Sequence, residues 1–287
     1  MQRKTTRRSR AATRPGGAAR RPATSEAARA DLYRLYEASV QDVDYDCDLV
    51  ERMFQRRYGR KPHVLREDFS GSSAMACAWT ERHPQNVAFA VDLDPAPLAW
   101  AREHHLAHLS DHEAGRVALL RGDVRDVETG LVDVVAAFNF SYFIFKERGE
   151  LLGYFEKTRN RLKRQGLFAL DLYGGADSHR ALSETRDLGE WFYVWDQAAF
   201  DPISYRALNH IHFRFRDGSR IERAFTYDWR LWSLPELRDL LFEAGFSRVQ
   251  PYWERTDRKT NEGTGSYYPA LRANDDPAWV AYLAAYR

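Results

Sequence analysis

Cysteine is scarce in this sequence of 287 residues, with Cys47 and Cys77 as the only two. Two cysteines are too few for a disulfide framework or for a zinc site built on cysteine. We therefore expect both to be reduced thiols of a cytoplasmic protein. Long apolar runs are also missing, and the mean hydropathy of -0.61 excludes a membrane span. The first 25 residues lack the apolar stretch that a secretory signal needs.

Acidic residues are absent from residues 1–25, which carry seven Arg and one Lys. The other 35 basic residues face 41 acids, so the rest of the chain has a net charge of about −6, although the whole chain stands at +2. Such a body is unsuited to a nucleic-acid groove, and only the basic segment is expected to contact phosphates. We expect residues 1–24 to form a disordered tail, with an organellar transit peptide as the alternative.

After the tail, apolar runs alternate with helical patterns, which is typical of a parallel sheet with helical crossovers. Residues 25–60 are expected to form two helices that cap the cofactor site, and residues 61–173 an α/β core. The expected strands of that core are Pro62–Arg66, Ala88–Asp92, Val117–Arg121, Val132–Asn139 and Leu167–Tyr173. The expected helices are Ser73–Arg82, Pro95–His108 and Arg148–Lys163, the last with Gly166 at its exit.

In residues 174–231 the alternation of strand and helix patterns stops, and polar and apolar residues alternate instead. Tyr205–Arg216 and Ser219–Arg230 flank Asp217-Gly218, a strong signal for a hairpin turn. We expect an antiparallel β insertion here. Its density of aromatic residues suits a lid, a substrate wall or a dimer interface, so a homodimer is one possibility.

Residues 232–287 are expected to complete the α/β core. Ser233 and Glu236 form a capping box at the start of a helix that Gly245 ends. Two strands are expected after it, Ser247–Trp253 and Trp279–Tyr286, joined by a loop rich in Gly, Asn and Asp.

The turn from the first strand of the core into its helix consists of small residues. Backbone can therefore approach a ligand closely there. The acid-x-Gly-x-Gly-x-Gly pattern of dinucleotide-binding folds is met only as Glu67-x-Phe69-x-Gly71-x-Ser73, with one glycine of three. Taken alone, this turn indicates no more than a nucleotide-type site.

Acids follow the next two strands. Asp92 ends the second strand, where an acid can accept both hydroxyls of a ribose. Asp94, which precedes a proline, is the better N-cap for the next helix, and this leaves Asp92 without a structural duty. Asp123 follows the third strand, where a carboxylate can accept the exocyclic amine of adenine. The carboxyl ends of parallel strands form the ligand-binding edge of open α/β sheets, so we expect these acids at one site with Asn139, at the end of the fourth strand.

These motifs resemble those of class I S-adenosylmethionine-dependent methyltransferases. The resemblance rests on Leu65–Ser73, Val91–Leu98 and Gly122-Asp123. A closer likeness, to a largely uncharacterised bacterial branch of that superfamily, is carried by Tyr36–Gln41, Leu65–Phe69 and Asp228–Trp232. The likeness spans roughly residues 30–287. It departs from the usual pattern at Phe69 and Ser73, where glycines are usual.

The resemblance implies a Rossmann-like, seven-stranded α/β sheet that is mostly parallel with its last strand antiparallel, and S-adenosyl-L-methionine as the cofactor. It implies that Glu67 and Asp68 lie near the methionine moiety, Asp92 at the ribose, and Asp123 with Val124 at the adenine. The cofactor-binding residues that we expect are Tyr36, Arg66, Glu67, Asp68, Phe69, Ser70, Gly71, Asp92, Leu93, Asp123, Val124 and Asn139.

Two of these residues have a structural alternative. Arg66 is a charged residue at the end of a buried strand, which requires a partner. That partner is either the carboxylate of the cofactor or an internal acid, Glu67 or Asp68. Tyr36 lies in the segment expected to cover the cofactor, and core packing explains it equally well.

Candidate catalytic residues are Asn139, Tyr142 and His210. Methyl transfer from a sulfonium to a free amine or thiolate mainly needs in-line positioning, whereas a hydroxyl or an ammonium needs a base. Asn139 and Tyr142 lie in a sequence that loosely resembles the Asn/Asp-Pro-Pro-Tyr motif of enzymes that methylate planar nitrogens, without its two prolines. His210 shares one strand face with His212 and two arginines. This face is exposed if the apolar face packs onto the core, and His210 is a candidate base if the hairpin covers the site.

The sequence therefore predicts a methyltransferase that acts on an N- or O-nucleophile of a small molecule in an aromatic-lined pocket, with no metal site and no membrane segment. One alternative is a methyltransferase of RNA or protein that uses the basic tail. Another is a protein that binds S-adenosylmethionine without transferring its methyl group. A dinucleotide oxidoreductase is least favoured because the glycine pattern is incomplete.

Overall fold

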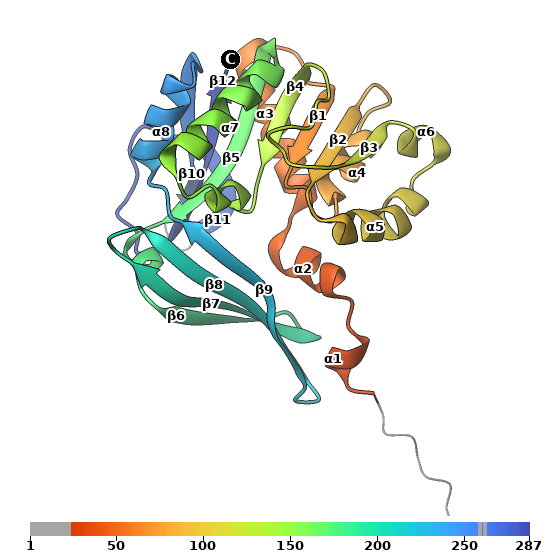
Figure 1. The fold of residues 1–287 in the computed structure, drawn as a ribbon, viewed down its shortest axis with the longest axis vertical. Helices are drawn as coiled ribbons and strands as arrows, with labels where there is room; N and C mark the ends of the chain where they lie inside the picture. Colours follow the sequence, from red (N-terminus) through yellow and green to blue (C-terminus); the bar gives the residue numbers. More distant parts are fainter. Residues whose placement is uncertain (1–23, 258–259, 261–262) are drawn as a thin grey trace, which may run out of the picture.

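The structure, a computed structural model, describes residues 24–257, 260 and 263–287. Residues 1–23 of the predicted tail lie outside this range. Eight strands form a main sheet in the order β11-β10-β12-β5-β4-β1-β2-β3 (Figure 1). Their bounds are β1 Val64–Asp68, β2 Val87–Asp92, β3 Val117–Arg121, β4 Val132–Ala137, β5 Leu162–Gly174, β10 Arg248–Thr256, β11 Gly263–Pro269 and β12 Trp279–Tyr286.

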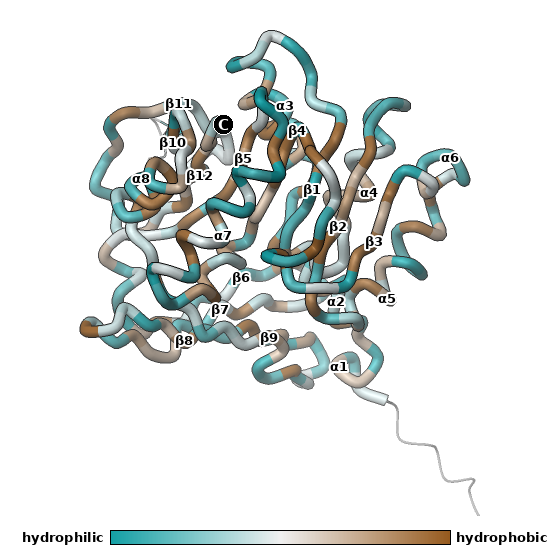
Figure 2. The backbone as a smooth tube through the Cα atoms, turned by 45° about the horizontal axis from the view of Figure 1, so that its top comes forward, coloured by the Kyte–Doolittle hydropathy of each residue, from teal (hydrophilic) through white to brown (hydrophobic). Residues whose placement is uncertain are grey.

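Strands β1 to β5 are parallel, so their carboxyl ends meet at one edge of the main sheet. β12 runs antiparallel to both of its neighbours, β5 and β10, and β11 runs antiparallel to β10. Every residue of β4 is buried, as expected for a central strand with helices on both faces. In Figure 2 β4 and β2 are accordingly largely hydrophobic in colour, whereas β1 has hydrophilic residues at its end.

Helices cover both faces of the main sheet. The described part of the chain has the helices α1 Glu26–Arg29, α2 Leu32–Val40, α3 Val43–Tyr58, α4 Ala74–Glu81, α5 Pro95–His104, α6 Asp111–Ala114, α7 Arg148–Arg161 and α8 Leu234–Glu243. Short 3₁₀ turns are η1 Leu106–His108, η2 Ser141–Ile144 and η3 Ala176–His179. Residues of α3 and α4 pack on one face, and residues of α7 and α8 pack on the other.

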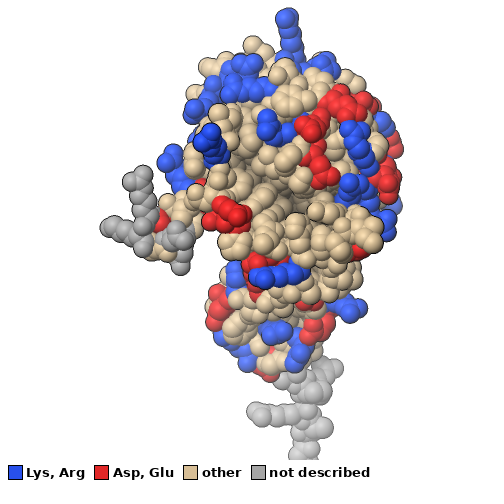
Figure 3. Space-filling model, turned by 90° about the vertical axis from the view of Figure 1, so that its left-hand side faces the viewer, with Lys and Arg blue, Asp and Glu red and all other residues tan. Residues whose placement is uncertain are grey.

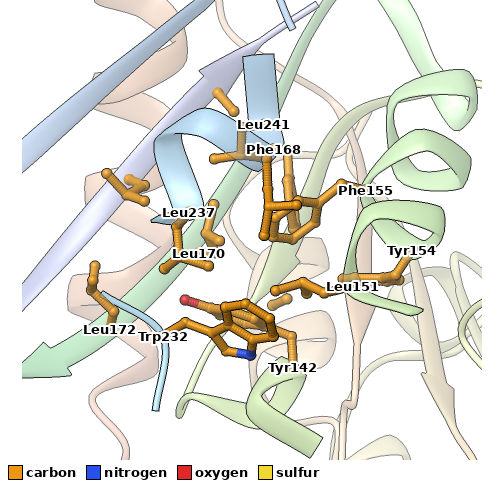
Figure 4. Close-up of a cluster of buried hydrophobic side chains, with 14 of the residues drawn as sticks. Tyr142, Leu151, Tyr154, Phe155, Phe168, Leu170, Leu172, Trp232, Leu237 and Leu241 are labelled. Carbon is orange, nitrogen blue, oxygen red and sulfur yellow. The ribbon is translucent and has the colours of Figure 1, made fainter. Parts of the chain in front are cut away.

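The core on the second face is largely aromatic and leucine-rich, and Figure 4 shows its centre. Side chains from α7 and α8 meet those of β5, with Tyr142 of η2 and Trp232 beneath them. Phe155 of α7 packs edge-on against Phe168 of β5, with 5.7 Å between the ring centroids. This packing joins the second half of the chain to the parallel strands.

A second sheet, antiparallel, lies below the carboxyl ends of the parallel strands (Figure 1). It consists of β6 Leu182–Asp187, β7 Trp191–Asp201, β8 Arg206–Phe215 and β9 Arg220–Arg230, in that order. One part of it packs against the main core through Trp195 and Trp229. Another part packs against α2, where Ile211 and Phe213 meet Leu35.

The predicted class of fold is confirmed: the main sheet is mostly parallel, its last strand is antiparallel, and an antiparallel β insertion follows β5. The main sheet has one strand more than expected. Gly263–Pro269, in the segment predicted as a loop, pairs with β10 as β11. The insertion likewise has the additional strand β6.

Several boundaries also differ from the prediction. α7 ends at Arg161, because Leu162 already pairs with Val132 of β4, and Gly166 therefore lies inside β5. The first predicted helix is divided in two before Asp31, whose side chain caps α2. In the described ranges, no helix is long and apolar enough to span a membrane.

Candidate active site

The turn between β1 and α4 has the backbone of a glycine-rich loop although it contains only Gly71 of the pattern. Phe69, Gly71 and Ser73 have φ angles of 57°, 51° and 59°. A left-handed conformation at a residue other than glycine costs on the order of 1–3 kcal/mol. Two hydrogen bonds fix the turn: Ser70 N–H donates to the carbonyl of Val91 at 3.0 Å, and the Ser73 hydroxyl donates to Ser70 Oγ at 3.2 Å.

Asp92 connects this turn to the end of β2. Its Oδ2 accepts the N–H of Gly71 at 2.7 Å, and its Oδ1 accepts the N–H of Asp94 at 2.9 Å. Asp94 caps α5 by accepting the N–H of Ala96, as predicted. The expectation that Asp92 has no structural duty is therefore wrong. Burial raises the pKa of Asp92, and the two N–H groups oppose this rise.

A pocket of about 560 Å³ opens beside the turn, and we call it the strand-end pocket. Its lining residues are Phe69, Asp92, Leu93, Asp94, Gly122, Asp123, Val124, Arg125, Ile144 and Phe145. The side chains of Leu93 and Ile144 are 68% and 49% exposed. Large apolar side chains that face water around a pocket are typical of a ligand site. The pocket thus combines acids from two strand ends with apolar walls.

Arg125, which the sequence analysis missed, orients Asp123. Its Nε and Nη2 donate to the two carboxylate oxygens of Asp123 at 3.0 and 2.7 Å, and its backbone N–H donates at 2.8 Å. These bonds lower the pKa of Asp123, which stays an ionised acceptor. The Arg125 guanidinium also lies 5.1 Å from the centroid of the Phe145 ring. An acid two residues before an arginine is too common a pattern to reveal this role.

Arg66 and Asp68 do not line the pocket, and this corrects their assignment to the cofactor. Arg66 is 0% exposed, and its Nε donates to Asp68 at 2.7 Å. Its other N–H groups donate to the carbonyls of Val124 at 2.8 Å and Val127 at 2.6 Å. Asp68 also accepts the hydroxyl of Tyr154 at 2.9 Å. The internal ion pair of Arg66 with Asp68 is thus confirmed, and it joins β1 to α7 and to the loop after β3.

Glu67 lies at the amino end of α4. It is 8% exposed, and its Oε2 accepts the N–H of Ala76 at 2.9 Å. Burial raises the pKa of Glu67 to about 8, with Asp46 and Asp92 as neighbouring negative charges. Burial likewise raises the pKa of Asp46 to about 7 and that of Asp171 to about 8. This side of the site is therefore rich in buried acids with raised pKa values.

Asp171 of β5, also missed by the sequence analysis, fixes the loop after β4. Its two carboxylate oxygens accept the backbone N–H groups of Asn139 at 2.8 Å and Phe140 at 2.9 Å. Both of these residues have φ near 58°. The hydroxyl of Tyr142 donates to the Asp171 carbonyl at 2.6 Å. Tyr142 is fully buried in the core, so its assignment as a catalytic or pocket-lining residue is corrected (Figure 4).

Tyr36 is a residue of α2 and packs against the second sheet. Its ring centroid is 4.9 Å from that of Phe225, and its hydroxyl is hydrogen-bonded to that of Tyr227. Burial raises the pKa of Tyr36, and the charge of Asp171 adds to this rise. Tyr36 therefore belongs to a contact that joins α2 to the second sheet on the side of Asp171.

His210 is not brought together with these residues. It lies on β8 between Asn209 and Ile211, whose side chains face the main core and α2, so its own side chain points to the outer face of the second sheet. There its Nδ1 meets Thr226 Oγ1 at 2.9 Å. His210 therefore lies apart from both the strand-end residues and the core, and at 4% exposed it is also not on the exposed face that the sequence alternative predicted.

A second pocket, of about 330 Å³, lies where the second sheet meets β5 and β12, and we call it the intersheet pocket. Phe140 and Tyr173 line it from the main sheet, with 4.8 Å between their ring centroids, and Trp195 lines it from β7. Figure 3 shows the surface hollowed between the main sheet, at the top, and the second sheet, at the bottom. Phe140 lines this pocket and Phe145 lines the strand-end pocket, so one short segment contributes to both.

No protein-family model matches the chain, and no curated protein matches its sequence. Solved structures match along most of its length. An S-adenosylmethionine-dependent methyltransferase from Clostridium acetobutylicum ATCC 824 has a TM-score of 0.63 and 16% identity, over 88% of this chain and 96% of that chain. CalS10, an amino pentose methyltransferase from Micromonospora echinaspora, has a TM-score of 0.60 and 15% identity over 88% and 96%. The sugar N-methyltransferase KedS8 from Streptoalloteichus sp ATCC 53650 has a TM-score of 0.59 and 14% identity over 96% and 99%. The chain has the fold of class I methyltransferases.

Proposed function

We propose that this chain is an S-adenosylmethionine-dependent methyltransferase of small molecules. The observation that carries the proposal is the strand-end pocket, in which Asp92 and Asp123 stand at the ends of neighbouring strands beside the exposed Leu93 and Ile144. These residue types suit a nucleoside, because a ribose and an exocyclic amine donate hydrogen bonds and an adenine ring needs apolar walls.

The residues of the pocket fit the cofactor as follows. Asp92 would accept the ribose hydroxyls, Leu93 and Ile144 would cover the adenine, and Asp123 would accept its amine. Gly71 has open space above it, since a Cβ there would meet no atom within 4 Å. The cofactor, when bound, supplies an electrophilic methyl group on a sulfonium ion. Glu67, which lies outside the lining at the amino end of α4, would accept a hydrogen bond from the ammonium of the methionine part.

The small-molecule acceptor is supported by the intersheet pocket. Its volume of about 330 Å³ has the scale of a small ligand, and residues of both sheets line it. CalS10 and KedS8 act, by their names, on an amino pentose and on a sugar nitrogen. In this proposal the chain itself positions the acceptor and excludes water. Positioning of two bound groups supplies much of the rate acceleration in a reaction between them.

Titration calorimetry with S-adenosylmethionine tests the proposal, with the wild type and Asp92→Asn. We expect the wild type to bind and Asp92→Asn to bind at least about tenfold more weakly, which corresponds to about 1.4 kcal/mol. Because Asp92 also accepts Gly71 N–H, a thermal melt of each variant shows whether the fold persists. Asp111→Asn, on the distant and exposed helix α6, is the matched control and keeps wild-type affinity.

Two outcomes would reject the proposal. One is a wild type that does not bind S-adenosylmethionine. The other is an affinity that Asp92→Asn leaves unchanged. A protein that binds the cofactor but yields no methylated product from small acceptors, with or without residues 1–23, would instead be a cofactor-binding protein.

A further inference from the structure

We infer that the intersheet pocket binds a small cationic amine and that the nitrogen of this amine accepts the methyl group. The inference deepens the proposed function and rests on it for the transfer step. It rests on the structure alone for the binding preference, which comes from three properties of the pocket: its rings, its acids and the orientation of one buried amide.

Aromatic rings form much of the wall. Phe140 and Tyr173 lie on the side of the main sheet, Trp195 lies on β7, and Trp279 lies at the start of β12. The rings of Tyr173 and Trp195 meet edge to face, with 6.5 Å between their centroids. The faces of aromatic rings carry negative potential, so a wall of several rings favours an alkylammonium group over a neutral group of the same shape.

All charged side chains in the lining are acidic. They are Asp177 of η3, Glu184 of β6 and Glu254 of β10, and no Lys, Arg or His among the described residues joins them. Asp177 is paired at the rim with Arg180, which does not line the pocket. Glu254 accepts the N–H of Gly265 at 2.7 Å. An anionic ligand would therefore meet repulsion, and a cation would be attracted.

Gln197 of β7 adds an independent sign of the ligand's character. It is 7% exposed, and its Nε2 donates to the carbonyls of Asp177 at 2.9 Å and Arg180 at 3.2 Å. Because two carbonyls surround the nitrogen, the amide can have only this orientation. Its oxygen then faces away from them, and no hydrogen bond to that oxygen is found within the described part of the chain. The buried amide thus offers the pocket an acceptor, as the three acids do.

A second buried amide lies behind the wall. Asn209 of β8 is buried beside the hydroxyl of Tyr173, and its Nδ2 forms no hydrogen bond of ordinary geometry with any described residue. The pocket itself is lined by the three acids, the Gln197 amide and several aromatic rings, among them Trp195 and Trp279. This combination is complementary to a protonated amine, which has donors and positive charge and no acceptor.

The location suits transfer between the two pockets. Phe140 lines the intersheet pocket and lies in the loop that follows β4. β4 pairs with β1, and the turn after β1 borders the strand-end pocket. For transfer, the amine first gives one proton to solvent or to Glu184. Its lone pair then forms the N–C bond while the C–S bond of the sulfonium breaks, and the electrons of that bond stay on sulfur. The products are a methylated amine and a neutral thioether.

The test compares matched ligands without the cofactor. Cyclohexylamine and benzylamine are titrated into the wild type at pH 7.5, with cyclohexanol and benzyl alcohol as neutral partners of the same shape, and binding is followed by saturation-transfer NMR. We expect each amine to bind at least about tenfold more tightly than its alcohol. Glu184→Gln and the exposed charge reversal Glu184→Lys are expected to remove most of this preference. Glu190→Gln, an exposed acid outside the pocket, is the matched control and keeps it.

Equal binding of amine and alcohol overturns the inference, as does an amine preference that survives Glu184→Lys. So does the absence of binding by both amines. Binding of S-adenosylmethionine is measured separately on the same protein. A chain that binds the cofactor and shows no amine preference contradicts this inference alone. A chain with the amine preference and no cofactor binding contradicts the proposed function and leaves the amine site in place.

Discussion

The carboxylate of Asp171 accepts the backbone N–H of Asn139 at 2.8 Å and so joins the end of β5 to the turn after β4. A second bond, from the N–H of Phe140, uses the other carboxylate oxygen. Asn139 and Phe140 are both left-handed, with φ of 58°. A loop of two such residues needs a partner that over-determines it. Asp171 therefore sets the position of Phe140, and with it one wall of the intersheet pocket.

Replacing Asp171 by Asn tests this role. The amide keeps one acceptor and turns the other into a donor that faces an N–H group, so one of the two loop bonds is lost. We expect the free energy of unfolding to fall by about 1–3 kcal/mol, the cost of an unsatisfied buried group. Urea denaturation measures this change. Asp239→Asn on the exposed side of α8 is the control. An Asp171→Asn protein as stable as the wild type would show that the loop holds its shape without this carboxylate.

Buried acids also predict how stability varies with pH. Burial raises the pKa of Glu67 and of Asp171 to about 8 and that of Asp46 to about 7. In the unfolded chain such acids titrate near pH 4. Between these limits the folded state binds more protons than the unfolded state, so stability falls as pH rises. Acids whose pKa is lowered in the folded state, such as Asp133, change the stability only at lower pH than this range.

We therefore expect the free energy of unfolding to decrease steadily from about pH 5.5 to pH 8.5. Urea denaturation at four pH values in this range measures it. Glu67→Gln, which removes one of the titrating groups, is expected to reduce the slope. A stability that rises with pH over the same range would contradict the raised pKa values of these acids in the folded state.

The left-handed residues of the turn after β1 give a third prediction. Ser73 has φ of 59° and is fully buried. Glycine adopts this conformation without strain. The greater entropy of its unfolded state, however, lowers the free energy of unfolding by roughly 0.5–1 kcal/mol. We expect Ser73→Gly to be close to neutral in thermal melts. Ser73→Thr keeps the hydroxyl but adds a β-branch at a positive φ, and it should lower stability by more than about 1 kcal/mol.

The prediction is checked by comparing the melting temperatures of Ser73→Gly and Ser73→Thr. If Ser73→Thr melts at the same temperature as Ser73→Gly, the backbone at this position is not left-handed in solution. The calorimetric affinity for S-adenosylmethionine should follow the same order, because the turn borders the strand-end pocket through Phe69.

Periodicity and strand ends predicted the features that depend on local sequence. The carboxyl end of β2 was placed at Asp92 because an apolar run stops there, and the N-cap role of Asp94 followed from the proline after it. The strand β11 was missed because its residues, rich in glycine and polar side chains, become a strand only by pairing with β10. Local propensity is weak in such segments, and tertiary pairing decides.

The candidate site likewise contains residues that local sequence predicts and residues whose roles depend on tertiary contacts. The sequence predicts Asp92 and Asp123 at the pocket because Asp92 ends one strand and Asp123 lies two residues after the end of the next. Asp171 lies within a strand, and its role depends on the backbone of a loop from elsewhere in the chain, so no pattern could show it. For Arg66 the sequence left two partners open. Which of them is present depends on how deeply the end of β1 is buried, and burial is a property of the folded chain.

The ion pair of Arg66 with Asp68 gives the last prediction. Both side chains are buried, so removing one charge leaves the other without compensation. Breaking a buried pair in this way costs about 3–5 kcal/mol, whereas an exposed pair contributes little. We expect Arg66→Met to be destabilised by this amount in urea denaturation at pH 7.5. Arg148→Met, which breaks the exposed pair with Glu243, serves as the control.

The pH dependence of this variant separates lost charge from lost packing. Burial raises the pKa of Asp68, and Arg66 opposes that rise. Without the arginine the pKa of Asp68 rises further, so the variant binds a proton on folding and its stability falls as pH increases. The loss relative to wild type should therefore be smaller at pH 5 than at pH 8. In Arg66→Met/Asp68→Asn no carboxylate remains to titrate, and this added pH dependence should disappear. A loss of equal size at both pH values in the single variant would mean that packing of the arginine stem, and not its charge, is what β1 requires.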